Sequence, residues 1–213
     1  MPQEYLTGKI DLNSSIDSLP FVQSRLSEVE NLMVSQADGY NPDLQSALRL
    51  LISTGGKRIR PTLILLIGDM LNADLQGTIT LAAAIELLHT ATLVHDDLID
   101  GALLRRGAPT LNSRWSPAAT VLTGDFLFSC SAYLVSLTDS IDIVRIFSKT
   151  LTTIVNGEIN QLFGGRCNLS HSDYFRRIYA KTASLFETST LTAALLSHAE
   201  PKLEQALKMF GSN

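Results

Sequence analysis

Three aspartates close to two histidines stand out in an otherwise apolar stretch, "LLHTATLVHDDLID", which ends at Asp100. At about 100° per residue on a helix, Asp96 and Asp100 differ by roughly 40° and share one face, whereas Asp97 turns partly aside. Hard divalent cations such as Mg²⁺ bind one or two carboxylates together with phosphate oxygens and water. The spacing therefore predicts a site for a metal-bound phosphate ester.

Basic residues follow the aspartates and also precede them. The alternative for the aspartates is a helix C-terminus with solvated acids, but acids at that end oppose the helix dipole and repel one another. Arg105 and Arg106 follow within a few residues, and "STGGKRIRP" contributes Lys57, Arg58 and Arg60. Guanidinium groups bind phosphate oxygens in a bidentate way. Two basic segments and a carboxylate pair therefore favour two phosphorylated substrates, and the adjacent glycine pair lets the first loop approach an anion closely.

Several of these candidates keep a second interpretation. His89 lies on the helix face of Asp96, two turns earlier, where a hydrogen-bonded core histidine is the alternative to a ligand-binding one. His95 is expected to pack against a neighbour or orient it rather than react. Lys181 in "IYAKTASLF" is, by itself, compatible with a lysine whose stem covers apolar surface while its ammonium group stays in water. Phe126 is a core residue by default.

The elements that must position these residues are helices, because a 3.6-residue periodicity recurs and strand signals are almost absent. Neither an internal repeat nor a convincing linker divides the chain, so we expect one all-α domain over residues 1–213. The predicted helices begin near Pro20 and after Pro42, span about 61–71, 78–100, 117–137, 143–165 and 172–197, and begin again after Pro201.

Composition limits the function. The 213 residues are 45% hydrophobic and 18% charged, enough for a substantial core. A net charge of −4 and a pI near 5.5 argue against nucleic-acid binding. Cys130 and Cys167 have no paired metal spacing and no secretory signal is evident, so we expect a cytoplasmic protein. Asp69, Glu86 and His89 interrupt the longest apolar stretches, so we expect no transmembrane segment, although the substrate could be apolar.

Five motifs occur in the order that is typical of one family: "GGKRIRP", "HTATLVHDDLIDGALLRRGAPT", "GDFLF", "GEINQ" and "AKTASLF". They resemble the trans-prenyltransferases, most of all the long-chain polyprenyl diphosphate synthases, over about residues 55–186 and more loosely over the whole chain. The resemblance implies an isoprenoid-synthase-type helical bundle. It also implies a Mg²⁺-dependent condensation of isopentenyl diphosphate with an allylic diphosphate, which loses its diphosphate to leave a carbocation shielded by apolar helices.

The resemblance also implies roles for individual residues. Asp96 and Asp100, assisted by Asp97, would bind Mg²⁺, and Mn²⁺ suits the same oxygen ligands. The catalytic set would be Asp96, Asp97, Asp100, Arg105 and Lys181; isopentenyl diphosphate would bind Lys57, Arg60, His89 and Arg106, and the allylic diphosphate Arg105, Lys181, Thr182 and Gln161.

Product length is predicted from the residues about one turn before the aspartates. Ala91 and Thr92 are small, where short-chain members of the family are bulky or aromatic. By the same resemblance, Phe126 or Leu127 would line the substrate tunnel. We therefore expect an open tunnel floor and a long-chain product, which Ala91→Phe should shorten.

The family has a second aspartate-rich motif after a Phe-Gly segment, and this sequence ends at "ALKMFGSN". We expect a truncated chain without its C-terminal helices, although a natural short form and a subunit completed by another chain stay open. Family members are commonly homodimers, so self-association is expected. Two alternative functions are a non-catalytic or half-site subunit of a heteromeric synthase and an unrelated structural bundle.

Overall fold

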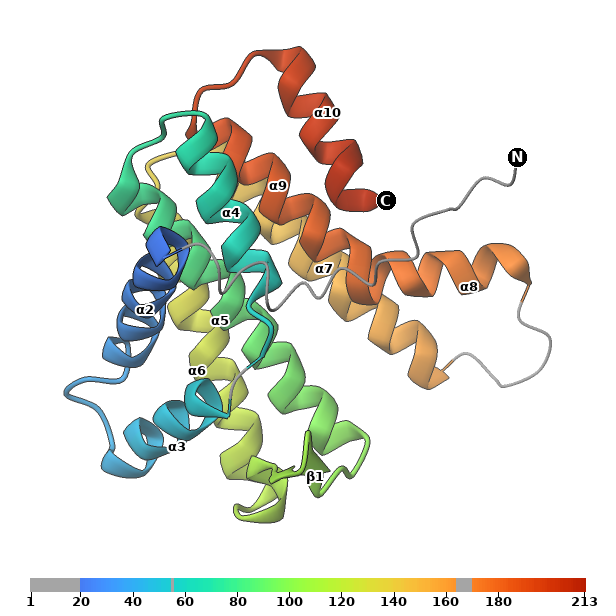
Figure 1. The fold of residues 1–213 in the computed structure, drawn as a ribbon. Coiled ribbons are helices and arrows are strands. Elements are labelled where there is room, and N and C mark those ends of the chain that lie inside the picture. The colour runs from blue at the N-terminus through green and yellow to red at the C-terminus, as the bar shows by residue number, and fades with distance from the viewer. Residues whose placement is uncertain (1–19, 55, 164–169) are drawn as a thin grey trace, which may run out of the picture.

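The structure, a computed structural model, describes residues 20–54, 56–163 and 170–213; Gly55 of the predicted anion-binding loop and Cys167 lie outside them. The prediction of an all-α fold is confirmed, and the described strands form only a short hairpin (Figure 1). The elements are α2 (Pro20–Ser35), α3 (Pro42–Ser53), α4 (Ile59–Met70), α5 (Leu75–Ile99), β1 (Leu104–Arg105), β2 (Ala108–Pro109), a 3-10 turn (Leu111–Ser113), α6 (Pro117–Ser136), α7 (Ile141–Phe163), α8 (His171–Ile178), a π-helix (Tyr179–Ala183), α9 (Ser184–Leu196) and α10 (Pro201–Ser212).

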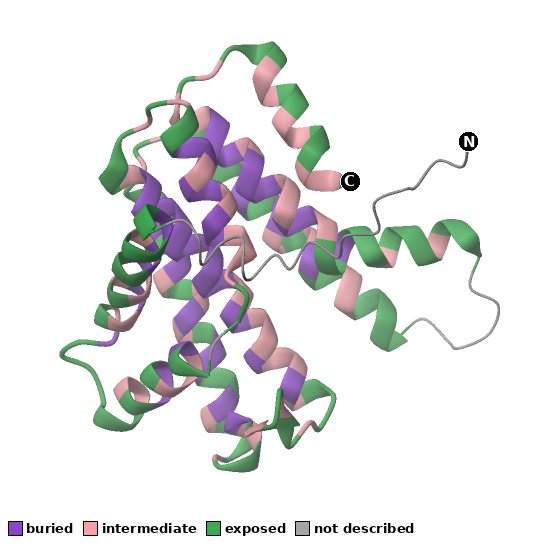
Figure 2. Cartoon of the chain, in the orientation of Figure 1, coloured by how far each residue is buried: buried purple, intermediate pink, exposed green. Residues whose placement is uncertain are grey.

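Helix α5 forms the centre of the bundle, and α2, α4, α6 and α9 pack around it (Figure 1). Its residues are apolar on nearly every side, which is typical of a fully enclosed helix. Leu81, Ile85 and Leu88 are completely buried, and Figure 2 shows the buried residues concentrated on α5 and its neighbours. The helix begins earlier than predicted because Asp74 caps it, accepting a hydrogen bond from the Gly77 N–H.

Helix α6 runs antiparallel to α5 along its length. Ser131 donates to the Ala84 carbonyl at 2.7 Å, and at the other end of the pair the His95 ring lies 3.1 Å from the Val121 carbonyl. Gly124 permits this approach, since an added Cβ would collide with the His95 ring. His95 therefore packs between the two helices, as the sequence predicts.

Two helices of the described residues, α5 and α6, are long and apolar enough to cross a membrane by length and composition alone. The core helix of a soluble protein meets the same criteria, and 78% of the apolar window in α5 is buried inside the bundle, against 39% in α6. The absence of a transmembrane segment stays a prediction.

The predicted helix over 172–197 is interrupted. The structure has α8, then a five-residue π-helix from Tyr179 to Ala183, and then α9. A π-helical turn holds one more residue than an α-helical one, so it shifts the helix face by about one residue, and the five residues involved are too few for periodicity to reveal the shift. Such turns are rare and are frequently found at functional sites, and this one contains Lys181 and Thr182.

Candidate active site

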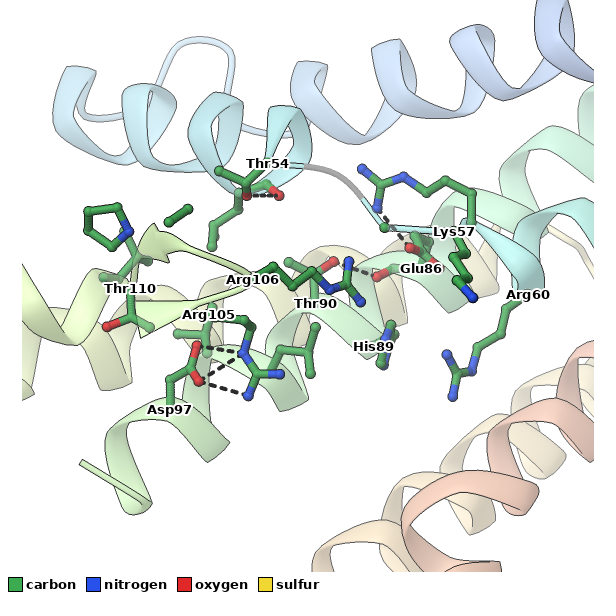
Figure 3. Close-up of a pocket in the computed structure, with 18 of the residues that line it drawn as sticks. Thr54, Lys57, Arg60, Glu86, His89, Thr90, Asp97, Arg105, Arg106 and Thr110 are labelled. Carbon is green, nitrogen blue, oxygen red and sulfur yellow. Dashed lines mark hydrogen bonds and ion pairs between the residues drawn. The ribbon is translucent and has the colours of Figure 1, made fainter. Parts of the chain in front are cut away.

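A cavity of about 200 Å³ opens between α3, the start of α4, α5 and the β1–β2 hairpin (Figure 3). Lys57, Arg60 and His89 lie together at one end of it, and Arg105 with Asp97 at the other. Two separate segments thus contribute cationic groups to one space, and α5 contributes His89. The cavity contains all four residues assigned by resemblance to isopentenyl diphosphate: Lys57, Arg60, His89 and Arg106.

Arg58, which lies between Lys57 and Arg60 in the sequence, has a structural role. It begins α4 in a left-handed conformation (φ 46°), and its guanidinium group donates to Glu30 at 2.8 Å, to Glu86 at 2.8 Å and to the Ile52 carbonyl at 2.6 Å. Burial alone would lower the pKa of Arg58, but Glu86 and Glu30 raise it above the usual value. Arg58 therefore joins α2, α3 and α5, and it fixes the loop with Lys57 and the first turn of α4 with Arg60.

The surroundings of the Arg60 guanidinium group differ from those of Arg58. Its guanidinium group lies 4.3 Å from the centre of the Phe186 ring, and its buried Nε has no hydrogen-bond partner among the described residues. Burial lowers the pKa of Arg60, and Glu86 opposes that shift. A buried N–H group without a partner is costly, so an anion in the cavity would relieve the cost.

The hairpin fixes the second pair of arginines. Leu104 pairs with Pro109 and Arg105 with Ala108, and both turn residues have positive φ angles, 53° at Arg106 and 80° at Gly107, as two-residue hairpins favour.

The same hairpin brings the two basic segments together. The Arg106 guanidinium group lies close to Gly56, and an added Cβ there would lie 2.8 Å from Arg106 Nη1. The predicted approach of this loop to an anion stays a prediction.

Asp97 forms an ion pair with Arg105 of the hairpin. It is buried, and Arg105 Nε donates to its Oδ1 at 2.8 Å and its Oδ2 at 3.0 Å, while Arg105 Nη2 lies 2.7 Å from Oδ1. Both carboxylate oxygens thus accept from the Arg105 guanidinium group, and this ion pair joins the end of α5 to the hairpin. The assisting role of Asp97 in metal binding stays a prediction.

Asp96 and Asp100 lie on successive turns at the end of α5, and the Asp100 N–H donates to the Asp96 carbonyl at 2.8 Å. Lys181 Nζ is 3.1 Å from Asp96 Oδ2 and 2.9 Å from Glu158 Oε1. Burial raises the pKa of Asp96, and the hydrogen bond from Lys181 opposes this shift. The ammonium group demonstrates that a positive charge fits beside Asp96.

Few side chains that could bind a metal ion lie close together among the described residues. Within residues 20–54, 56–163 and 170–213, no group of three or more His, Cys, Asp or Glu side chains could hold a metal ion by itself. Asp96 and Asp100 still fit Mg²⁺, which binds through one or two protein carboxylates and completes its shell with water and phosphate oxygens.

The other allylic-site candidates are exposed. Thr182 follows Lys181 in the π-helix, and Gln161 lies on α7 about one turn after Glu158. Glu158, rather than Gln161, contacts Lys181, so it is a site residue that the prediction missed. Its helical spacing to Gln161 within "GEINQ" was the available signal. Glu86 was also missed as a cavity residue, although it shares a helix face with His89.

His89 is half-buried and lines the cavity. Its pKa is lowered from 6.5 to about 3 by burial and then by Arg60, Arg106, Arg105 and Arg58. The imidazole is therefore neutral near pH 7, with one ring nitrogen as a donor and the other as an acceptor.

The chain-length candidates differ in position. Ala91 is completely buried, and it shares a helix face with His95, which packs against α6. Thr92 is half-buried one turn before Asp96 and donates to the His89 carbonyl at 2.7 Å. Leu127 is also buried, whereas the Phe126 ring is half-buried and lies 5.3 Å from that of Tyr40. Thr92 is thus the candidate nearest the aspartates.

Comparisons with known proteins match this fold and these motifs. The polyprenyl synthetase model matches residues 41–213. The chain is 34% identical to solanesyl-diphosphate synthase 2, chloroplastic, of Oryza sativa subsp. japonica (97% of this chain, 53% of the relative) and 35% identical to octaprenyl diphosphate synthase of Escherichia coli (80% and 54%).

A solved structure agrees with these matches. The polyprenyl synthase of Caulobacter crescentus, complexed with calcium and isoprenyl diphosphate, is 32% identical with a TM-score of 0.87, over 99% of this chain and 62% of the other. The chain thus spans about half the length of the sequence relatives it matches. It belongs to the polyprenyl synthetase family.

Proposed function

We propose that this chain forms the larger part of the active site of a trans-prenyltransferase that extends an allylic diphosphate with isopentenyl diphosphate. One observation carries the proposal: Lys57, Arg60, His89 and Arg106 line one cavity whose far end reaches Asp97, which follows Asp96 at the end of α5. Such a site suits one diphosphate in the cavity and a second one at the aspartates.

In the cavity, the residues would bind and orient isopentenyl diphosphate. The unpartnered Nε of Arg60 and the neutral ring of His89 supply N–H groups to its oxygens, and Lys57 adds a positive charge. Glu86 and Arg58 hold the wall that carries these groups. The apolar core of α5 behind them excludes water from the reacting carbon atoms.

At the aspartates, Arg105 and Lys181 would bind the allylic diphosphate. The allylic C–O bond breaks with its electron pair going to the diphosphate, the double bond of isopentenyl diphosphate forms the new C–C bond, and a proton leaves. A bound Mg²⁺, for which Mn²⁺ is an alternative, would neutralise charge that develops on the leaving group. Fixed cations placed where negative charge develops contribute much of the rate in such reactions.

The proposed product is a long-chain polyprenyl diphosphate. The small side chains of Ala91 and Thr92 before Asp96 support it, as does the similarity of the chain to octaprenyl and solanesyl diphosphate synthases.

We further propose a homodimer in the cytoplasm. The exposed apolar side chains of Leu122, Tyr133 and Ile141 on α6 and α7 support self-association. Size-exclusion chromatography with light scattering would test it, and a monomer at micromolar concentration would contradict it.

The deciding experiment is mass spectrometry of the products formed from farnesyl diphosphate and isopentenyl diphosphate with Mg²⁺. We expect elongated polyprenyl diphosphates, lost in Asp96→Asn and Lys57→Met and retained in Lys202→Met, which removes the same charge from α10, outside the cavity. Calorimetry with isopentenyl diphosphate separates the outcomes. Binding without turnover would favour the half-site subunit, and neither binding nor turnover by a folded chain would refute the proposal.

A further inference from the structure

Lys181 and Asp96 are 85 residues apart in sequence and in contact in the fold. The Lys181 ammonium group makes two ion pairs, with Asp96 Oδ2 at 3.1 Å and with Glu158 Oε1 at 2.9 Å. Three elements meet there: the end of α5, helix α7 and the π-helix. The ammonium group thus lies between two carboxylates from different helices.

The three side chains are not equally free to move. Asp96 and Glu158 are 15% and 20% exposed, whereas Lys181 is 46% exposed. The carboxylates are held in the bundle, and the lysine reaches them from the open side. Its long, flexible stem allows the ammonium group to leave with little change elsewhere.

A divalent cation on Asp96 would bring a second positive charge to the carboxylate whose Oδ2 the ammonium group now contacts. Two positive groups only a few ångströms apart repel strongly where water is partly excluded. Glu158 would keep a displaced ammonium group close to the site, where phosphate oxygens can accept its hydrogen bonds.

We propose that Lys181 competes with the divalent cation for Asp96, and that Glu158 is the positioning residue that holds the competing ammonium group in place. The inference rests on the proposed function, because it takes Asp96 as a metal ligand. In this proposal, binding of the metal ion is coupled to movement of the Lys181 ammonium group from the Asp96 carboxylate to the phosphate oxygens.

Binding of Mn²⁺ alone, measured from the electron paramagnetic resonance signal of the free ion, tests this competition without turnover. We expect Lys181→Met to bind Mn²⁺ about fivefold more tightly than the unaltered chain, as loss of a half-exposed ion pair allows. The matched control is Lys208→Met, since Lys208 is 43% exposed and pairs with Glu187 at 3.6 Å, away from Asp96. It should bind Mn²⁺ like the unaltered chain.

A second measurement uses the unaltered chain, so it does not depend on a variant that folds. Mg²⁺ should increase the acetylation of Lys181 by acetic anhydride about twofold or more, relative to Lys208 in the same digest, as peptide mass spectrometry reports. Acetylation of Lys181 that is unchanged or slower with Mg²⁺ would overturn the inference.

Asp96→Asn separates the two proposals. If it abolishes Mn²⁺ binding while Lys181→Met binds like the unaltered chain, the competition is wrong and the metal site stands. If Asp96→Asn leaves Mn²⁺ binding unchanged, or if no variant binds Mn²⁺, the metal assignment is wrong and the inference falls with it.

Discussion

The ion pair between Glu86 and Arg58 should be the main polar support of the cavity. Its two side chains are 5% and 11% exposed, with Oε1 and Nη1 2.8 Å apart. Glu86→Ala leaves a buried guanidinium group with one partner fewer, and breaking a buried pair in this way costs about 3–5 kcal/mol. Glu30 still accepts from Arg58 at 2.8 Å, so we expect the lower end of that range.

Urea unfolding followed by circular dichroism measures this cost. The matched control is Asp142→Ala, which breaks a pair with Arg145 whose side chains are 70% and 74% exposed and should cost about 0.5 kcal/mol or less. The same Glu86 variant should weaken binding of isopentenyl diphosphate, because Lys57 and Arg60 flank Arg58. A loss of unfolding free energy no larger than that of Asp142→Ala would refute this account of the cavity wall.

Three other predictions concern the helix α5 itself. If Asp97 acts mainly by positioning Arg105, Asp97→Asn should raise the KM of the allylic substrate about tenfold while Mn²⁺ affinity changes less than twofold. A matching loss of Mn²⁺ affinity would instead support the predicted assistance of Asp97 in metal binding. The pKa of His89 is about 3 in the folded chain and 6.5 in the unfolded chain. Between these pH values the unfolded chain binds one more proton than the folded chain. The free energy of unfolding therefore falls as the pH drops from 6.5 to 3, by at most about 1.4 kcal/mol per pH unit. His89→Gln should flatten this pH dependence in urea unfolding, and an unchanged slope would contradict the assignment. Thr92→Phe should shorten the product, as should Ala91→Phe if α5 and α6 tolerate the larger side chain; unchanged product length in a folded Thr92→Phe would exclude this mechanism of length control.

The sequence allowed the helical fold to be predicted because its signals are local. Apolar periodicity, Pro20, Pro42 and Pro117 near helix starts, and glycines in the connections act over a few residues. The boundaries that moved, at Asp74 and at the π-helix, depend on a side-chain cap and on an extra residue in one turn. A cap lies outside the apolar pattern, and the shift from one extra residue is confined to a single turn, so the pattern did not reveal either of them.

The candidate site, too, could be predicted only in part from the sequence. The shared face of Asp96 and Asp100 and the presence of two basic loops follow from spacing and residue type, and the family motifs added the assignment of His89. Charge alone, in contrast, could not distinguish the structural role of Arg58 from the proposed binding role of Lys57. Three acceptors on three separate elements make the difference.

The amino-acid sequence by itself determined that this is an all-helical protein with an acid pair on one helix face and cations near it. Tertiary structure alone decided which charges meet: Asp97 with Arg105 across the hairpin, Arg58 with Glu86, and Lys181 with Asp96 over 85 residues. Helix periodicity specifies which residues share a face, but partners across helices depend on packing angles and on where each helix begins. These are set by long-range contacts of the folded core.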